Sequence, residues 1–341
     1  MAGKITMTSA IPFFIVAILV AATGVSSDDA APIPADAAQV ATWFTDNIKP
    51  LPERQGLNDT LQAAEATPKI VKVRQDGSGE FKTVMEAVNS VPPGNTQRVI
   101  IDIGPGVYKE KVTVENSKRF VTFYGAPDNV PTLSFDGTAA KYGTVYSATL
   151  QVDAPFFTAA NLIIENTAPK PDGKAVGAQA LALRIGGDMA TFYNVRLLGF
   201  QDTLCDDKGR HFFKDCYIEG TVDFIFGSGK SIYLKSQDED TGFSFVHCNV
   251  TGKGTGAMLG RAWTEMPKVV FAYTTMTSVV DPAGWSNNNH PDREPFSLRD
   301  QGSAPNTRAP FTKQLTEEQV KPFITLGYIE GSKWLLPPPK V

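Results

Sequence analysis

Three stretches of this chain share one pattern: FYNVRLLG at 192–199, FKDCYIEG at 213–220 and FVHCNVTG at 245–252. Each begins with phenylalanine and ends with glycine, and an apolar residue stands two places before the glycine. The first two copies begin 213 − 192 = 21 residues apart. A coil of three short strands with tight turns needs roughly 20–25 residues. The repeat therefore predicts an all-β fold, a right-handed parallel β-helix whose apolar side chains stack in ladders inside.

Short β-rich runs separated by turns fill most of the chain. A sandwich or a barrel also contains many short strands, so the repeat decides between these folds. A helical stretch at 81–91 is ended by prolines, and a capping box at 316–319 begins a tail that we expect to pack on the exterior. The expected strands are 71–73, 99–103, 120–124, 148–152, 157–164, 181–185, 190–198, 212–218, 231–234, 243–250 and 269–273.

The N-terminus has the composition of a secretory signal peptide. Lys4 precedes an apolar run at 11–22, and small residues follow at 25–27. The apolar run is short for a transmembrane helix, so we expect a signal peptide at 1–27, with a signal anchor as the alternative. The mature protein is then secreted and extracellular, with no membrane attachment once the signal is removed.

Two further regions follow the signal. Residues 28–68 are an expected N-terminal extension with one short helix at 40–48, and residues 69–341 are the expected β-helix domain. Glycosylation sequons at Asn58 and Asn249 fit a secreted glycoprotein.

Composition excludes some classes of function. The 341 residues carry a formal net charge of −4 and no lysine or arginine run, which argues against nucleic-acid binding. A local cationic cluster can still bind an acidic polymer. The three histidines are scattered, so we expect no metal site and no cofactor, and the G-x-S-x-G nucleophile motif is absent.

The chain has three cysteines, Cys205, Cys216 and Cys248, which is no disulfide framework. Cys216 and Cys248 occupy equivalent positions of the repeat. They either stack on neighbouring coils and pair, or remain buried free thiols in a ladder.

Two aspartates share one position of the repeat. Asp202 lies 202 − 192 = 10 residues after Phe192, and Asp223 lies 223 − 213 = 10 residues after Phe213. Equivalent residues on adjacent parallel strands are ~4.8 Å apart, so the two carboxyl pKa values should separate. One carboxylic acid beside one carboxylate suits two-step hydrolysis through a covalent intermediate. Aspartates also cap turns, but the apolar neighbours here would make an idle carboxylate costly.

Five motifs resemble those of plant pectin methylesterases, in the family's order. The likeness runs from about residue 70 to the C-terminal LGYIEGSKWLLPPP, and it is closest to the form without the inhibitor-like pro-region. The resemblance implies a parallel β-helix, an esterase acting on methyl-esterified homogalacturonan of the cell wall, and a proteinaceous inhibitor as a second partner. We expect a monomer. The motifs are GVYKE at 106–110, QALALR at 179–184, QDTL at 201–204, DFIFG at 223–227 and LGRAW at 259–263.

The resemblance also implies a role for each motif residue. Tyr108 and Glu110 are expected to be structural, because they lie several coils before the aspartates. The implied roles are Asp223 as nucleophile, Asp202 as general acid and base, Gln179 and Gln201 as oxyanion donors, Arg261 as the partner that orients Asp223, and Arg261, Trp263 and Phe226 as substrate contacts.

The chain departs from the family pattern in three places. Only eight residues stand between Leu234 and Phe243, about one coil fewer than the family leads us to expect. Loss of a whole coil would move Arg261 by ~5 Å along the axis, whereas loss of a loop or lateral strand would be milder. Residues 293–312 lack an expected aromatic-acidic strand, and Cys205 stands where tyrosine is common. The alternative function is therefore a catalytically impaired pectin-binding relative; a lyase or glycosidase ranks lower.

Overall fold

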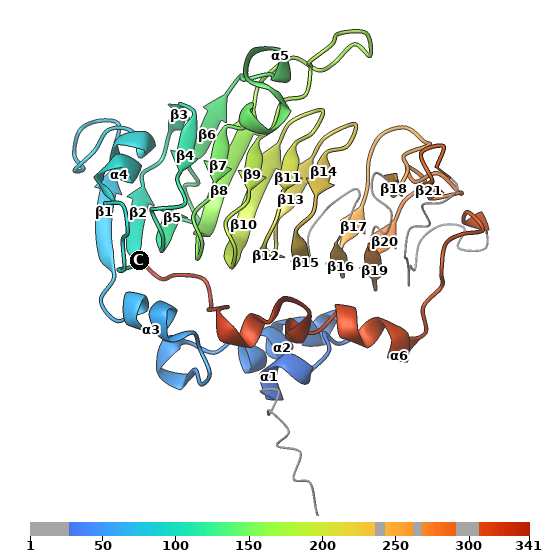
Figure 1. Ribbon diagram of the computed structural model, residues 1–341, viewed down its shortest axis with the longest axis horizontal. Helices are drawn as coiled ribbons and strands as arrows, with labels where there is room; N and C mark the ends of the chain where they lie inside the picture. The colour runs from blue at the N-terminus through green and yellow to red at the C-terminus, as the bar shows by residue number, and fades with distance from the viewer. Residues whose placement is uncertain (1–26, 236–242, 262–267, 291–306) are drawn as a thin grey trace, which may run out of the picture.

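The structure, a computed structural model, describes residues 27–235, 243–261, 268–290 and 307–341. Strands of successive coils lie side by side in parallel along one axis (Figure 1). The predicted parallel β-helix is confirmed. The long sheet has the spatial order β1 (Lys69–Val73), β2 (Val99–Ile103), β5 (Val121–Gly125), β8 (Thr158–Asn166), β10 (Ala190–Leu198), β12 (Arg210–Lys214), β15 (Lys230–Leu234), β16 (Ser244–Val246) and β19 (Val270–Ala272), with β3 (Val107–Lys109), β6 (Thr132–Phe135) and β13 (Tyr217–Glu219) beside this path.

A shorter sheet carries the strands that begin two residues after each of the paired aspartates. Its strands are also parallel and come one from each coil. Two further strand pairs complete the far end of the solenoid. The short sheet consists of β4 (Val112–Val114), β7 (Leu150–Val152), β9 (Leu183–Ile185), β11 (Leu204–Asp206) and β14 (Ile225–Gly227); the pairs are β17 (Asn249–Val250) with β20 (Thr275–Met276) and β18 (Gly260–Arg261) with β21 (Trp285–Ser286).

Two predicted strands are each interrupted by a corner. The predicted strand 212–218 is the two strands β12 and β13, because Asp215 between them has a φ of +55°. The predicted strand 243–250 is divided in the same way into β16 and β17, with His247 at a φ of +55°. A left-handed residue bends the chain sharply, so each corner ends one strand and starts the next. The strands β12 and β13 both pair with β10, whereas β17 leaves the long sheet and pairs with β20.

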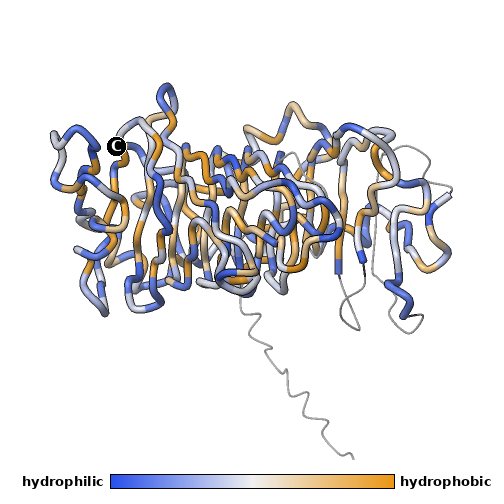
Figure 2. Tube along the Cα trace, turned by 90° about the horizontal axis from the view of Figure 1, so that it is seen from above, coloured by the Kyte–Doolittle hydropathy of each residue, from blue (hydrophilic) through white to orange (hydrophobic). Residues whose placement is uncertain are grey.

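Aromatic rings form the predicted ladder in the core. Phe192, Phe213, Tyr233, Phe245 and Phe271 occupy matching positions on consecutive strands of the long sheet. Successive ring centroids are 4.5, 4.5, 4.7 and 4.8 Å apart, and the rings are stacked. Hydrophobic segments of the stacked coils accordingly follow one another along the axis (Figure 2). Tyr233 is a rung that the phenylalanine pattern missed.

The position of Tyr233 in the ladder changes the interpretation of the cysteines. Since the coil of Tyr233 stands between those of Cys216 and Cys248, the two thiols are not on neighbouring coils. All three cysteines are buried thiols, and none forms a disulfide bond. The thiol of Cys216 contacts the carbonyl of Phe192 at 3.6 Å, and that of Cys248 contacts the carbonyl of Tyr233 at 3.4 Å. The pairing alternative was wrong, and the buried-thiol alternative is confirmed.

The shortened segment leaves the long sheet intact. Phe212 pairs with Ile232, a step of 232 − 212 = 20 residues, and Ile232 pairs with Ser244, a step of only 244 − 232 = 12 residues. The strands β15 and β16 are nevertheless direct neighbours, whereas the described short sheet ends at β14. In this coil the chain therefore adds one strand to the long sheet, and its described part adds no strand to the short sheet. This is the milder of the two outcomes considered from the sequence.

Tyr108 and Glu110 have structural contacts. Tyr108 is 2% exposed and donates a hydrogen bond to the carbonyl of Gly104 at 3.0 Å. The carboxylate of Glu110 accepts from the backbone N–H groups of Val84 and Met85, at 2.9 and 2.8 Å, at the start of α4 (Val84–Ser90). These N–H groups lack intrahelical partners, so the carboxylate stabilises the helix N-terminus.

Replacing Glu110 by alanine should therefore lower the free energy of unfolding by about 1–2 kcal/mol, because two helix-end donors lose their acceptor. Urea unfolding followed by circular dichroism measures this. The control is Glu53→Ala, an exposed carboxylate with no such contact, which should change stability by less than about 0.5 kcal/mol. Equal effects of the two substitutions would contradict the capping role.

Segments from both ends of the chain pack together on one face of the long sheet (Figure 1). Ile33 donates its backbone N–H to the carbonyl of Ile324 at 2.8 Å, and Asp29 accepts from the backbone N–H of Ser332 at 2.8 Å. The expected exterior position of the tail and the predicted helix at 40–48 are thus confirmed. The elements are α1 (Ser27–Ala30), η1 (Ala37–Gln39), α2 (Val40–Asn47), η2 (Leu51–Glu53) and α3 (Asp59–Glu65) from the N-terminal side, and α6 (Glu317–Val320), η5 (Lys321–Phe323), η6 (Leu326–Ile329) and η7 (Gly331–Lys333) from the C-terminal side; the short helices α5 (Ala139–Tyr142) and η3 (Thr144–Tyr146) lie elsewhere, before β7.

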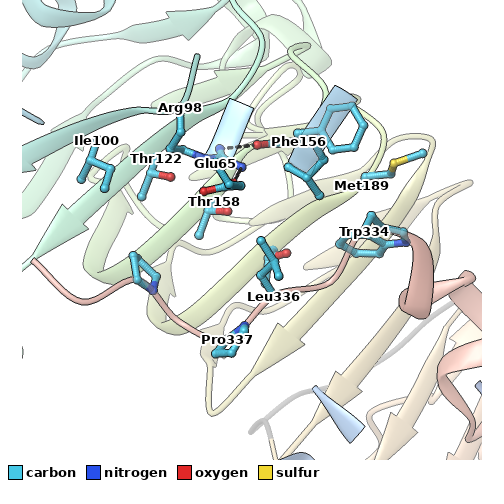
Figure 3. A pocket seen from close by; sticks show the side chains of 13 residues that line it. Glu65, Arg98, Ile100, Thr122, Phe156, Thr158, Met189, Trp334, Leu336 and Pro337 are labelled. Carbon is cyan, nitrogen blue, oxygen red and sulfur yellow. Dashed lines mark hydrogen bonds and ion pairs between the residues drawn. The ribbon is translucent and has the colours of Figure 1, made fainter. Parts of the chain in front are cut away.

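Arg98 fixes these terminal segments to the sheet. Its guanidinium pairs with Glu65 at the end of α3 and donates to the carbonyl of Phe156 at 2.7 Å, in a crevice also lined by Trp334 and Leu336 (Figure 3). With both polar partners satisfied, the crevice joins the terminal layer to the sheet.

In the described part of the chain, no helix is long and apolar enough to cross a membrane.

Candidate active site

The two aspartates lie level with each other on adjacent coils. Leu204 pairs with Ile225, and both aspartates stand two residues earlier, at 204 − 2 and 225 − 2. The backbone N–H of Asp202 donates to the carbonyl of Val222 at 3.0 Å, which holds this register ahead of the strands. Their φ angles are +64° and +48°, a left-handed conformation that aspartate tolerates better than most residues. The repeat position predicted from the sequence is therefore a strained corner that aims both side chains together.

Asp202 is the buried member of the pair. It is 7% exposed. Burial, and then the nearby charge of Asp223, raise the pKa of Asp202 to about 7, while Arg261 acts in the opposite direction. At pH values below 7 this carboxyl group therefore holds a proton that it can donate.

Asp223 is more open and is paired with a cation. The Arg261 guanidinium forms an ion pair with the Asp223 carboxylate, and the two side chains are 34% and 28% exposed. Arg261 belongs to β18, which lies beyond the shortened segment. Because β15 and β16 remain adjacent in the long sheet, Arg261 stays within reach of Asp223, and the ion pair is present in this chain. It fixes the direction of the Asp223 carboxylate.

Gln179 and Gln201 stand beside the aspartates on two successive coils. The backbone N–H of Ala180 donates to the carbonyl of Gln201 at 3.1 Å. This bond holds the two coils in register, so that each glutamine comes one residue before the same position of the stack. Both side chains are half-buried, and within the described ranges neither amide is hydrogen-bonded to the protein. They can donate hydrogen bonds to a group bound over the aspartates.

Comparison with known proteins agrees with this arrangement. A family profile described as Pectinesterase matches residues 70–237. Pectinesterase 2 of Olea europaea is 51% identical over 344 residues, which cover 92% of this chain and 93% of that protein. A pectinesterase of Parthenium hysterophorus matches to the same extent. The chain belongs to the pectinesterase family.

Solved pectin methylesterases have the same fold. The enzyme from carrot superimposes with a TM-score of 0.67 at 28% sequence identity, covering 79% of this chain and 95% of that chain. Pectin methylesterase PemA from Erwinia chrysanthemi superimposes with a TM-score of 0.64 at 25% identity, covering 79% and 98%. Membership of the pectinesterase family therefore rests on both sequence and fold.

A small apolar cluster follows the aspartates in this pectinesterase-family chain. Phe226 is half-buried and packs with Ala148, Leu181 and Cys205. Cys205 pairs with Phe226 in the short sheet and is 2% exposed. Burial raises the pKa of the Cys205 thiol strongly, so it is no nucleophile at neutral pH. Trp263, the other predicted aromatic contact, lies outside the described residues, as does most of the altered 293–312 region.

Arg184 is a further charged residue beside the site that sequence reasoning did not single out. It neighbours Cys205 across the short sheet and pairs with Asp153 at 2.8 Å and Asp207 at 2.7 Å. The ion pairs link three coils at this edge of the short sheet. The signal was present in the QALALR motif, where an arginine follows an otherwise apolar strand, but its partners come from other coils.

A buried polar cluster lies behind the short sheet. The Asp206 carboxylate contacts Nδ1 of His211 at 2.6 Å and accepts hydrogen bonds from the hydroxyl groups of Ser231 and Tyr233, at 2.5 and 2.8 Å. All four residues are fully buried. The cluster joins β11 of the short sheet to β12 and β15 of the long sheet, four residues after Asp202, and therefore supports that corner from inside. Among the described residues there is no group of three side chains suited to holding a metal ion.

Proposed function

We propose that this chain hydrolyses the methyl esters of cell-wall homogalacturonan, so that pectin and water give pectate and methanol. The observation that carries the proposal is the pair itself: Asp202, with a pKa of about 7, stands level with Asp223, whose carboxylate is held by Arg261. One proton donor and one oriented carboxylate on the same surface are the groups that two-step ester hydrolysis requires.

In the first step, an oxygen of Asp223 attacks the carbonyl carbon of the methyl ester. The carbon–methoxy bond breaks, and Asp202 gives its proton to the departing methoxy oxygen, releasing methanol. The product is an acyl-enzyme in which Asp223 and the uronate share an anhydride bond. Arg261 keeps the attacking carboxylate in position.

In the second step, the deprotonated Asp202 takes a proton from water, and the resulting hydroxide attacks the uronate carbonyl carbon. The anhydride bond breaks, Asp223 leaves as a carboxylate, and Asp202 is again protonated. The same residue thus acts first as acid and then as base.

Gln179 and Gln201 are the proposed donors to the tetrahedral oxyanion. Each such hydrogen bond contributes ~3 kcal/mol to stabilisation of the transition state in comparable sites. Phe226, and Trp263 on the LGRAW motif, are the proposed apolar contacts for the sugar rings.

The setting of the reaction is part of the proposal. The signal peptide at 1–27 would direct the chain to the cell wall, leaving the extension at 28–68 and the β-helix domain at 69–341 as a monomer. A proteinaceous inhibitor is a second proposed partner, and Asn58 and Asn249 are proposed glycosylation sites. Both asparagines are accessible, Asn58 being half-buried and Asn249 exposed.

A catalytically impaired pectin-binding relative is the second candidate. The short step between β15 and β16 is the specific observation that favours it, because the short sheet ends early. Binding of pectin without methanol release at any pH between about 5 and 9 would support this candidate.

The pH dependence of methanol release tests the proposal. Because the first step needs protonated Asp202, kcat/KM should be constant below its pKa of about 7 and fall about tenfold per pH unit above it. Initial rates on highly methylated galacturonan between pH 5 and 9 measure this, with chain cleavage assayed in parallel. An enzyme that gains activity steadily up to pH 9 would contradict Asp202 as the acid.

A further inference from the structure

A buried threonine joins the two coils that carry the aspartates. Thr203 immediately follows Asp202 and is fully buried. Its hydroxyl group donates a hydrogen bond to the carbonyl oxygen of Glu219 at 2.9 Å. Glu219 is the last residue of β13 and stands 223 − 219 = 4 residues before Asp223. The threonine side chain therefore ties the corner of one aspartate to the segment that leads into the other.

The side chain of Thr203 fits between two glycines, which end the first two copies of the sequence repeat. A Cβ atom at Gly199 would lie 2.8 Å from Oγ1 of Thr203, and a Cβ atom at Gly220 would lie 2.7 Å from the same oxygen. Both distances are well below ordinary van der Waals contact. Any larger residue at either position would therefore have to displace the threonine.

Two backbone hydrogen bonds flank the threonine contact and join the same two coils. The N–H groups of Asp202 and Leu204 donate to carbonyl groups of the coil of Asp223, at 3.0 and 2.7 Å. The hydroxyl group of Thr203 adds a third link from the residue that lies between these two donors. Because both aspartates have a left-handed backbone, the three links oppose relaxation of the strained corners.

The same threonine contact occurs two coils earlier, away from the aspartates. Thr149 is also fully buried, and its hydroxyl group donates to the carbonyl of Glu165 at 2.8 Å. Each threonine immediately precedes a strand of the short sheet, β7 or β11, and β9 lies between these strands. Ala148 precedes Thr149 where an aspartate precedes the other threonine. The contact thus stabilises the coil wherever it occurs, and only its second copy is attached to the aspartate pair.

We propose that Thr203 is a positioning residue, whose hydroxyl group sets the separation of the Asp202 and Asp223 carboxyl groups. The inference rests on the proposed function, because it gives Thr203 a part in that reaction. Proton transfer requires the acid within hydrogen-bond reach of the leaving oxygen, so a displaced Asp202 corner slows the chemical step more than binding.

Displacement of this corner would also change the protonation of Asp202. Burial, and then the charge of Asp223, raise the pKa of Asp202, while Arg261 acts in the opposite direction. A corner released from Glu219 would be less buried and farther from Asp223. The pKa of Asp202 would therefore fall, which gives the proposal a second measurable consequence.

Steady-state kinetics of Thr203→Val and Thr203→Ser test the proposal. Valine has nearly the shape of threonine but no hydroxyl group, so kcat should fall about tenfold while KM changes less than about twofold. The fall of kcat/KM at high pH should begin about half a pH unit lower than in the wild type. Serine keeps the hydroxyl group, so its kcat should stay within about twofold of the wild type.

The matched control is Thr149→Val, which loses the same kind of hydrogen bond two coils away. It should lower the urea midpoint of unfolding as much as Thr203→Val does, but leave kcat within about twofold and the pH profile unchanged. Equal kcat values and equal pH profiles of the two valine variants would overturn the proposal. A serine variant as impaired as Thr203→Val would overturn it as well.

Gly199→Ala tests the same contact from the other side. The three atoms nearest to its new Cβ all belong to Thr203, so the methyl group should displace that side chain and lower kcat about tenfold. In a Thr203→Ala background the space is free, and Gly199→Ala should lower kcat by less than about twofold further. Full, independent effects of the two substitutions would contradict an action through Thr203.

Failure of the proposed function is recognised separately. A wild type that releases no methanol sinks the proposed function, but urea unfolding at several pH values still reports the protonation of Asp202 without turnover. The loss of stability between pH 3.8 and about 7 should then be smaller in Thr203→Val than in Thr149→Val. Equal losses in the two variants would overturn the positioning role.

Discussion

Asp223→Asn should lower kcat for methanol release by on the order of 10⁴-fold, with KM little changed. Asparagine has nearly the shape of aspartate but cannot form the acyl-enzyme, so the loss falls on the chemical step rather than on binding. The amide also loses the ion pair with Arg261. Measurement of methanol from highly methylated galacturonan gives kcat and KM separately.

The chain offers a matched control in Asp215→Asn. Asp215 has a φ of +55°, close to the +48° of Asp223, and its exposed carboxylate pairs with Lys214. The substitution thus makes the same change at a similar corner away from the site, and kcat should stay within about twofold of the wild type. Activity of Asp223→Asn within tenfold of the wild type would exclude Asp223 as the nucleophile. Loss of activity in both variants would point to damage to the corners instead.

Asp202→Asn should make the protein more stable and nearly inactive. The amide cannot transfer the proton, so kcat should fall about 10²–10⁴-fold. The folded-state pKa of about 7 lies above the unfolded value of 3.8, so folding favours the protonated form of Asp202. Burial of Asp202 therefore does not lower the free energy of unfolding of the wild type below pH 3.8. It lowers that free energy progressively as the pH rises from 3.8 to 7.

The size of the change in stability follows from the shift in the pKa of Asp202. A difference of about three pKa units corresponds to roughly 4 kcal/mol, reached above pH 7. The neutral asparagine avoids that penalty, so the stability advantage of the variant should grow by about 3 kcal/mol between pH 4.5 and pH 8. Urea unfolding at several pH values measures it. An advantage that is the same at every pH would mean that burial does not perturb Asp202.

The part of the fold that depends on repetition was predictable from the sequence. The 21-residue step placed Asp202 and Asp223 in register before any contact was known, and the strands 99–103 and 190–198 were predicted with their bounds. Each follows from side chains that must alternate or recur to reach the core. The site's register is a consequence of the same periodicity.

What the sequence did not reveal depends on backbone conformation and on distant partners. His247 reads as part of a continuous strand, yet its φ of +55° turns the chain, and no composition rule marks that residue. Tyr233 occupies a position of the ladder that a search for phenylalanine does not find, although its ring stacks on the neighbouring ring in the same way. The ion pair between Arg261 and Asp223 crosses the shortened segment, so the sequence alone left it undecided.

The joining of the two chain ends has a consequence for biosynthesis. Asp29 contacts Ser332, 303 residues later, and Ile33 contacts Ile324. While the ribosome is still producing the middle coils, the first helices lack the C-terminal segments that pack beside them on the same face. The coils can stack in the order of their synthesis, but the terminal layer closes only after the last residues emerge. A nascent chain stalled before residue 324 would therefore expose that face to chaperones and proteases.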